Sequence, residues 1–164
     1  MIKNYALEIK WGVLFILMQL AWMTMERLAG LHDTHIDKHA VVTNLVAIPA
    51  ILMYVLALRE KRNKQLGGAM TYRQGFTAGL IMTIVVTLLS PLSQYITSTI
   101  ITPDYFENAI QYAVSSGAST QEEAEANFNL KNYLMITVLF TPVMGIVTTA
   151  IVALFLKKGP KTAN

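Results

Sequence analysis

The chain has 164 residues, of which 54% are hydrophobic and only 14% are charged. A typical soluble domain carries about 25% charged residues, so this composition excludes an ordinary soluble domain and indicates a single membrane domain over residues 1–164. The chain has no cysteine, which excludes disulfides, thiolate metal sites and cysteine nucleophiles. The net charge is +3, but only the positions of the charged residues along the chain can indicate a partner.

The first apolar segment is residues 11–25, which carry no formal charge. Apolar residues on both sides extend it, because Lys10 can reach back to the membrane surface, and we expect a helix over about residues 5–28. A cleaved signal peptide is the main alternative, with Lys3 and Lys10 as its basic region. Arg27 stands where a cleavage site requires a small residue, so we expect this first helix to be retained.

Three further apolar segments predict spans over about residues 40–58, 73–101 and 132–156. A charged run at residues 59–64, together with Gly67 and Gly68, predicts a solvated turn between the second and third spans. Residues 74–103 are uncharged, and as a helix they are about 45 Å long. This exceeds the about 30 Å hydrocarbon core of a bilayer, so the third span must tilt, bend at Pro91 or emerge from the lipid. The sequence thus predicts an all-α bundle of four transmembrane helices.

The distribution of charge predicts the orientation of this bundle. With four spans, both chain ends and the turn after the second span share one side, which holds ten of the thirteen basic residues: Lys3, Lys10, Arg59, Lys61, Arg62, Lys64, Arg73, Lys157, Lys158 and Lys161. Because Lys and Arg near span ends favour the cytoplasm, we expect both chain ends inside the cell and no nucleic-acid partner. Aromatic residues mark the two boundaries, the inner one by Tyr5, Trp11, Tyr54 and Tyr72 and the outer one by Trp22, Tyr95, Tyr105 and Tyr133.

Several short motifs accompany this pattern. The basic turn is followed by Met-Thr-Tyr-Arg-Gln-Gly-Phe at residues 70–76 and by Gly79, and the third span is followed by Ile-Thr-Pro-Asp-Tyr at residues 101–105. The fourth span carries Pro142 and Gly145 and ends in Ala-Leu-Phe-Leu-Lys-Lys. With these residues the chain resembles the uncharacterised bacterial membrane-protein family catalogued as domain of unknown function 4199. The resemblance covers most of the chain and implies a four-span bacterial inner-membrane protein with no assigned reaction and no catalytic residues.

Small residues recur at every fourth position in the third and fourth spans, where they lie along one helix face. The third span offers Gly75, Gly79, Thr83 and Thr87, and the fourth offers Thr141, Gly145, Thr149 and Ala153. Because lipid is as apolar as leucine, close backbone contact holds membrane helices together better than hydrophobic burial does. We therefore predict that these two antiparallel faces meet. Use of the same faces in a homodimer is the alternative.

Three prolines, Pro49, Pro91 and Pro142, fall inside the spans and should each remove a backbone hydrogen bond and bend the helix. Polar residues at similar depths suggest a membrane-deep cavity, with the set Gln19, Asn44, Pro91 and Gln94. Simple kinking with interhelical hydrogen bonds is the other interpretation. No ionisable residue stands at mid-membrane, which disfavours coupled transport.

All three histidines, His32, His35 and His39, lie in or next to the first outer loop. On a helix their spacing would place them on one face, and neutral imidazoles with a carboxylate suit zinc. The loop is short, however, and lacks the H-E-x-x-H pattern, so we expect ordinary exposed histidines and no metal site. We interpret Glu26 and Arg27 as an interfacial pair in contact with water.

The outer connection, residues 102–131, predicts two short helices. Thr102 is expected to cap a helix that begins at Pro103, and Gly117 to end it. This helix is amphipathic, and Phe106 and Ile110 on its apolar face form a possible partner surface. Thr120 and Glu123 match a capping box that starts the second helix.

No enzyme signature is present: the chain has no Walker A loop, nucleophile elbow or nicotinamide glycine motif, and we expect neither catalysis nor a cofactor. The favoured function is a small structural or accessory membrane protein that acts through helix contacts. Its partners are then the lipid bilayer and either further copies of itself or a membrane complex. The alternative is a small-solute transporter or channel with its polar cavity near Pro91.

Overall fold

The computed structural model describes residues 5–159, and within this part of the chain it contains helices and no strand. Lys3 and Lys161, which contribute to the predicted orientation, lie outside the described residues. The elements in order are α1 (Ala6–Leu28), α2 (Ile36–Val42), the 3₁₀ turn η2 (Thr43–Val46), α3 (Ala47–Glu60), the π-helical turn η3 (Lys61–Gln65), α4 (Tyr72–Ile96), the π-helical turn η4 (Thr97–Ile101), α5 (Tyr105–Ser115), α6 (Gln121–Asn127) and α7 (Leu130–Leu156).

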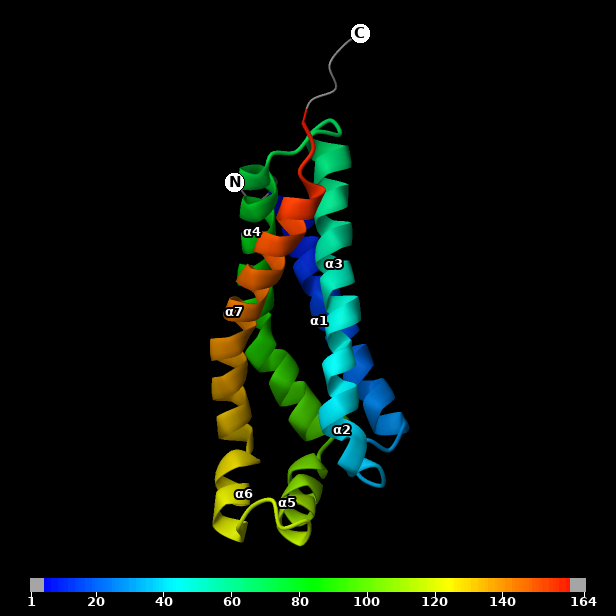
Figure 1. The fold of residues 1–164 in the computed structure, drawn as a ribbon, viewed down its shortest axis with the longest axis vertical. Helices are drawn as coiled ribbons and strands as arrows, with labels where there is room; N and C mark the ends of the chain where they lie inside the picture. Colours follow the sequence, from blue (N-terminus) through cyan, green and yellow to red (C-terminus); the bar gives the residue numbers. More distant parts are fainter. Residues whose placement is uncertain (1–4, 160–164) are drawn as a thin grey trace.

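Four of these helical segments are long and apolar enough to cross a membrane: Ala6–Leu28, Ile36–Gln65, Tyr72–Ile101 and Leu130–Leu156. Figure 1 shows them as a tall bundle in which the start of α1 and the end of α7 lie at the same end. We call this the basic end, and we call the opposite end, which carries α5 and α6, the outer end. The predicted all-α membrane bundle is confirmed.

The second span is longer than the sequence predicts, because helix continues through the charged run 59–64 to Gln65. The prediction of a solvated turn over that run is therefore wrong. Lys61 Nζ lies 2.6 Å from a carboxylate oxygen of Glu8, and Lys10 Nζ lies 2.6 Å from Glu60, so α1 supplies partners that keep these charges on a helix. The turn itself is confined to the residues after Gln65, where Gly67 has a positive φ that favours glycine.

The flanks of the bundle are covered with large apolar side chains. Leu88 is 75% exposed and Phe155 is 79% exposed, and the same surface continues over Leu17, Ile48, Ile51, Leu52, Ile84, Leu92, Leu139, Phe140, Val143 and Met144. Soluble monomers rarely expose contiguous apolar patches of this extent. Lipid is the solvent that this surface requires.

Helix α4 is the central element of the bundle, because its most extensive contacts are with α7 and with α1. Its buried side chains Met82 and Val86 join Leu58, Ala57 and Ile16 in the core. Tyr54 of α3 also belongs to the core: it is 3% exposed, and its hydroxyl lies 2.9 Å from Thr83 Oγ1. Tyr54, which the sequence analysis assigns to the inner membrane boundary, is therefore buried between helices rather than on the surface of the bundle.

The basic end is closed by one pair of backbone hydrogen bonds. Met70 N donates to the carbonyl of Lys158 at 2.9 Å, and Lys158 N donates to the carbonyl of Met70 at 2.8 Å. This antiparallel bridge joins Met70, two residues before α4, to Lys158, two residues after the end of α7. Met70 is only 1% exposed, so its two backbone groups are satisfied by the chain rather than by water.

The three prolines lie at different places in their helices. Pro49 falls in the first turn of α3, directly after the 3₁₀ turn η2, whereas Pro91 and Pro142 stand inside α4 and α7. In Figure 1 the lower half of α4 diverges from α7 and runs toward α1 and α2. Proline is a common cause of such a bend because it cannot donate to the preceding turn.

The outer helices follow their sequence signals in part. Thr120 Oγ1 accepts from Glu123 N while the Glu123 carboxylate accepts from Thr120 N, so the predicted capping box is confirmed. Gly117, with φ +71°, ends α5 in a Schellman motif in which Ala118 N donates to the carbonyl of Ala113. The predicted cap at Thr102 is wrong, because its hydroxyl donates to the carbonyl of Thr97 and closes η4 instead.

Candidate metal centre at the outer end

A buried carboxylate organises the outer end of α1. Glu26, in the last turn of α1, is 3% exposed and accepts a hydrogen bond from the indole Nε1 of Trp22. Arg27 turns away and donates to the carbonyls of Ile100 and Ile101 at the end of η4. The interpretation of Glu26 and Arg27 as an interfacial pair in contact with water is therefore wrong for Glu26, which is buried, whereas Arg27 is exposed and has different partners.

The end of α1 returns the chain toward this carboxylate. Gly30 has φ +73°, and Leu31 N donates to the carbonyl of Glu26 while Gly30 N donates to that of Arg27. This is a Schellman motif, which requires the left-handed conformation that glycine adopts at low cost. As a result His32 lies beneath the end of the helix, 4% exposed, with Nε2 3.2 Å from Glu26 Oε2.

A second histidine reaches the same oxygen from α2. His39 Nδ1 lies 3.6 Å from Glu26 Oε2, and the rings of His32 and His39 are 4.9 Å apart between centroids. One potential ligand atom from each of the three residues lies within 4.8 Å of the other two. His35 is exposed and stays outside this set. The expectation of three exposed loop histidines is therefore wrong for His32 and His39.

Helix α5 covers the cluster. The ring of Tyr105 lies 5.3 Å from that of His32 and 5.1 Å from that of His39, between centroids. Asn108 Nδ2 donates to the backbone carbonyl of His32 at 2.9 Å. Burial raises the pKa of Tyr105, so its hydroxyl remains protonated, and it lies 3.2 Å from the hydroxyl of Tyr133. The cluster is thus enclosed by α1, α2 and α5.

The small residues of α4 and α7 are brought together. A Cβ added to Gly79 would lie 2.7 Å from Thr149 Oγ1, and one added to Gly145 would lie 2.7 Å from Thr83 Oγ1. A Cβ on Gly75 would meet Ala153 at 3.3 Å. Each glycine therefore receives a side chain from the facing helix, whereas Thr141, on the same face of α7, is only half-buried.

The four residues of the predicted cavity do not form one lining. Asn44 is exposed and donates to the carbonyl of Ala40 in its own helix. Gln94 donates to Ser98 Oγ and accepts from Thr137 of α7 at 3.4 Å, which is an interhelical contact. Gln19 and Pro91 are half-buried.

The residues of the predicted partner surface have contacts within the chain. The ring of Phe106 packs edge-on against that of Tyr133, at 5.1 Å between centroids. Both Phe106 and Ile110 are half-buried. Part of the apolar face of α5 is therefore used to cover the bundle.

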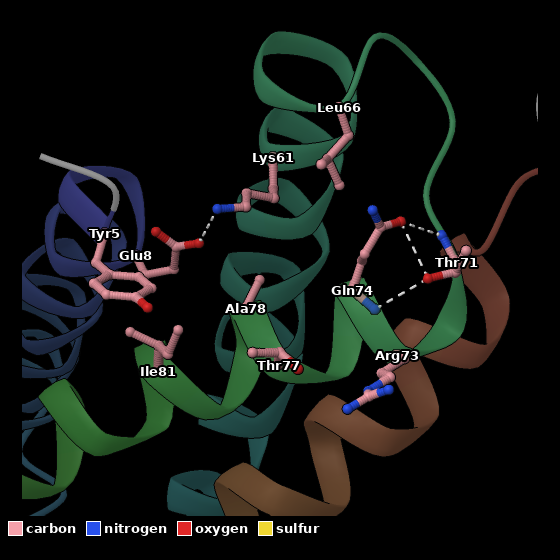
Figure 2. A pocket seen from close by; sticks show the side chains of 10 residues that line it. All are labelled: Tyr5, Glu8, Lys61, Leu66, Thr71, Arg73, Gln74, Thr77, Ala78 and Ile81. Carbon is pink, nitrogen blue, oxygen red and sulfur yellow. Dashed lines mark hydrogen bonds and ion pairs between the residues drawn. The ribbon is translucent and has the colours of Figure 1, made fainter. Parts of the chain in front are cut away.

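A pocket of about 400 Å³ lies at the basic end, between α1, η3 and α4. Figure 2 shows the Glu8–Lys61 pair on one side of it and the cap of α4 on the other, where Thr71 Oγ1 accepts from Gln74 N. Arg73 of α4 also lines the pocket. Three charged side chains of the basic end, Glu8, Lys61 and Arg73, thus line one recess.

The long apolar helices, their lipid-facing flanks and a polar cluster confined to the outer end define a small α-helical membrane protein. A family model described as a protein of unknown function (DUF4199) matches residues 10–158. The chain belongs to this family, and the resemblance noted in the sequence is confirmed. Neither a curated protein nor a solved structure matches the chain.

Proposed function

We propose that this protein is a structural or accessory subunit of the inner membrane, non-catalytic, with both chain ends in the cytoplasm. The observation that carries the proposal is the reciprocal fit of Gly79 with Thr149 and of Gly145 with Thr83, which fills the space between α4 and α7. A bundle packed in this way is suited to hold its shape and to present its outer faces to other helices.

Transport is the weaker alternative. A pathway past the polar residues of the spans needs them to face a common interior, but Asn44 is exposed and bonded within its own helix. Gln94 is engaged with Ser98 and Thr137. The pocket at the basic end is lined by residues of α1, η3 and α4 rather than by these side chains.

The orientation is tested with reporter fusions. Green fluorescent protein at either chain end should fluoresce, and alkaline phosphatase at either end should be inactive, because basic span ends are retained in the cytoplasm. Alkaline phosphatase inserted at Gly117 should be active, because this turn lies at the outer end of the bundle. The turn is exposed and has open space around it, so the insertion should be tolerated. Opposite locations of the two ends would contradict both the orientation and the four-span topology.

The accessory function is tested by purification in a gentle detergent followed by native mass measurement. We expect a defined assembly, either an oligomer of this chain or a stoichiometric complex, that Ile110→Ser dissociates. Val41→Ser is the control, because Val41 is 74% exposed on α2 and does not belong to the predicted partner surface. Phe106→Ser is less clean, since it also removes the contact with Tyr133. A monomer without partners that catalyses solute flux in proteoliposomes would contradict the proposal.

A further inference from the structure

We propose that Glu26, His32 and His39 form a zinc site that joins the outer ends of α1 and α2. The donor atoms are Glu26 Oε2, His32 Nε2 and His39 Nδ1. Neighbouring ligands of tetrahedral zinc, at about 2.0–2.1 Å from the metal, lie about 3.3 Å from one another. The two measured edges from Glu26 Oε2, 3.2 Å to His32 and 3.6 Å to His39, are close to this separation.

Glu26 accepts from Trp22 and pairs with His32 Nε2, but two ring nitrogens of the cluster are left without a hydrogen-bond partner in the described part of the chain. His39 Nδ1 is buried and has no hydrogen-bond partner among the described residues, and the same holds for His32 Nδ1. A buried polar atom without a partner is costly. A divalent ion between the three donors would engage His39 Nδ1 and neutralise the carboxylate that lies 3% exposed between two imidazoles.

The donor types favour a transition metal such as zinc over Mg²⁺ or Ca²⁺. Two imidazoles and one carboxylate are a zinc set, whereas Mg²⁺ and Ca²⁺ prefer oxygen ligands throughout. Tyr105 is not a ligand, because its hydroxyl faces that of Tyr133. Three protein donors leave one position of a tetrahedron for water.

The surrounding residues fix the donors in place. Trp22 donates to the other oxygen of Glu26, and Asn108 holds the backbone of His32 from α5. Such outer-shell contacts orient ligands. A bound ion would therefore connect α1, the 29–35 loop and α2 directly, and α5 through Asn108.

The test is isothermal titration of metal-stripped protein in detergent with Zn²⁺, together with metal analysis. Wild type should bind one zinc per chain. The double variant His32→Ala/His39→Ala should lose this binding, and Glu26→Gln should weaken it by more than the about 10–100-fold typical of losing an outer-shell partner. His35→Ala, a histidine of the same loop outside the cluster, should bind as wild type does.

A second measurement on the unaltered chain keeps the proposal testable even where a variant fails to fold. Co²⁺ in a four- or five-coordinate nitrogen and oxygen site absorbs strongly in the visible range, and added Zn²⁺ should abolish this band. Zinc should also raise the melting temperature of wild type and of His35→Ala only. Absence of the cobalt band, equal zinc binding by wild type and the double variant, or loss of binding in His35→Ala would each overturn the proposal.

Discussion

Lys61→Met should destabilise the folded bundle by about 3 kcal/mol or more, which is the range for removing one partner of a buried ion pair. Glu8 is 2% exposed, and Lys61 Nζ lies 2.6 Å from its Oε1. Methionine keeps the length of the lysine stem but leaves the buried carboxylate without a counter-charge. The free energy of unfolding can be measured by denaturation in mixed detergent and SDS micelles.

Two matched variants separate this effect from a general loss of basic charge. Lys64→Met removes the 2.9 Å contact with Glu60, but Lys64 is 73% exposed, so the cost should be about 0–1 kcal/mol. Glu8→Met/Lys61→Met removes both charges and should be more stable than Lys61→Met alone. Equal stabilities of Lys61→Met and Lys64→Met would show that the Glu8–Lys61 pair does not hold α1 to the second span.

Gly79→Ile and Gly145→Ile should each separate α4 from α7, at a cost of about 3 kcal/mol, the upper end of the usual range for overpacking. The first Cβ atom alone would approach the hydroxyl of the facing threonine to 2.7 Å in both cases, and isoleucine adds three further carbons. The melting temperature in mild detergent should fall by roughly 6 °C or more for a chain of this size. Gly79→Ala should give a smaller decrease in the same direction.

Gly159→Ile is the matched control, because a Cβ at Gly159 would meet nothing within 4 Å among the described residues 5–159, and the melting temperature should stay unchanged. The homodimer alternative makes a different prediction for the same proteins. If Gly79 served contact between two chains, Gly79→Ile would lower the measured mass and leave the melting temperature of the monomer unaltered.

The spans could be predicted because uncharged length is a local property of the sequence. Their ends could not, since they depend on partners from elsewhere in the chain. The charged run after residue 58 reads as a solvated turn until Glu8 and Lys10 of α1 are known to lie beside it. The contact between α4 and α7 could be predicted from the four-residue spacing of Gly75, Gly79 and Thr83, because helix periodicity places such residues on one face.

The meeting of Glu26 with His32 and His39 could not be predicted from the sequence, for a geometric reason. Glu26 and His32 are separated by a reversal of the chain at Gly30, and no periodicity continues across it. Two signals were available in the sequence. Trp22 and Glu26 lie one turn apart on the first helix, and Gly30 lies just beyond its end, which is typical of a Schellman motif. His39 rather than His35 reaches Glu26 because α2 begins at Ile36. The start of such a short helix depends on tertiary contacts and could not be predicted from the sequence.

The hydrogen-bonded bridge between Met70 and Lys158 has a consequence for how this molecule can move. Sliding of α4 along α7 would break both bonds of that bridge and move Gly79 and Gly145 away from their threonines, so we expect the two helices to move together as one half of the bundle. Any rearrangement has to displace α1 and α3 against that half. Spin labels meant to follow such a motion therefore belong across the α3–α4 boundary, and a truncation that removes Lys158 should loosen the half that otherwise stays fixed.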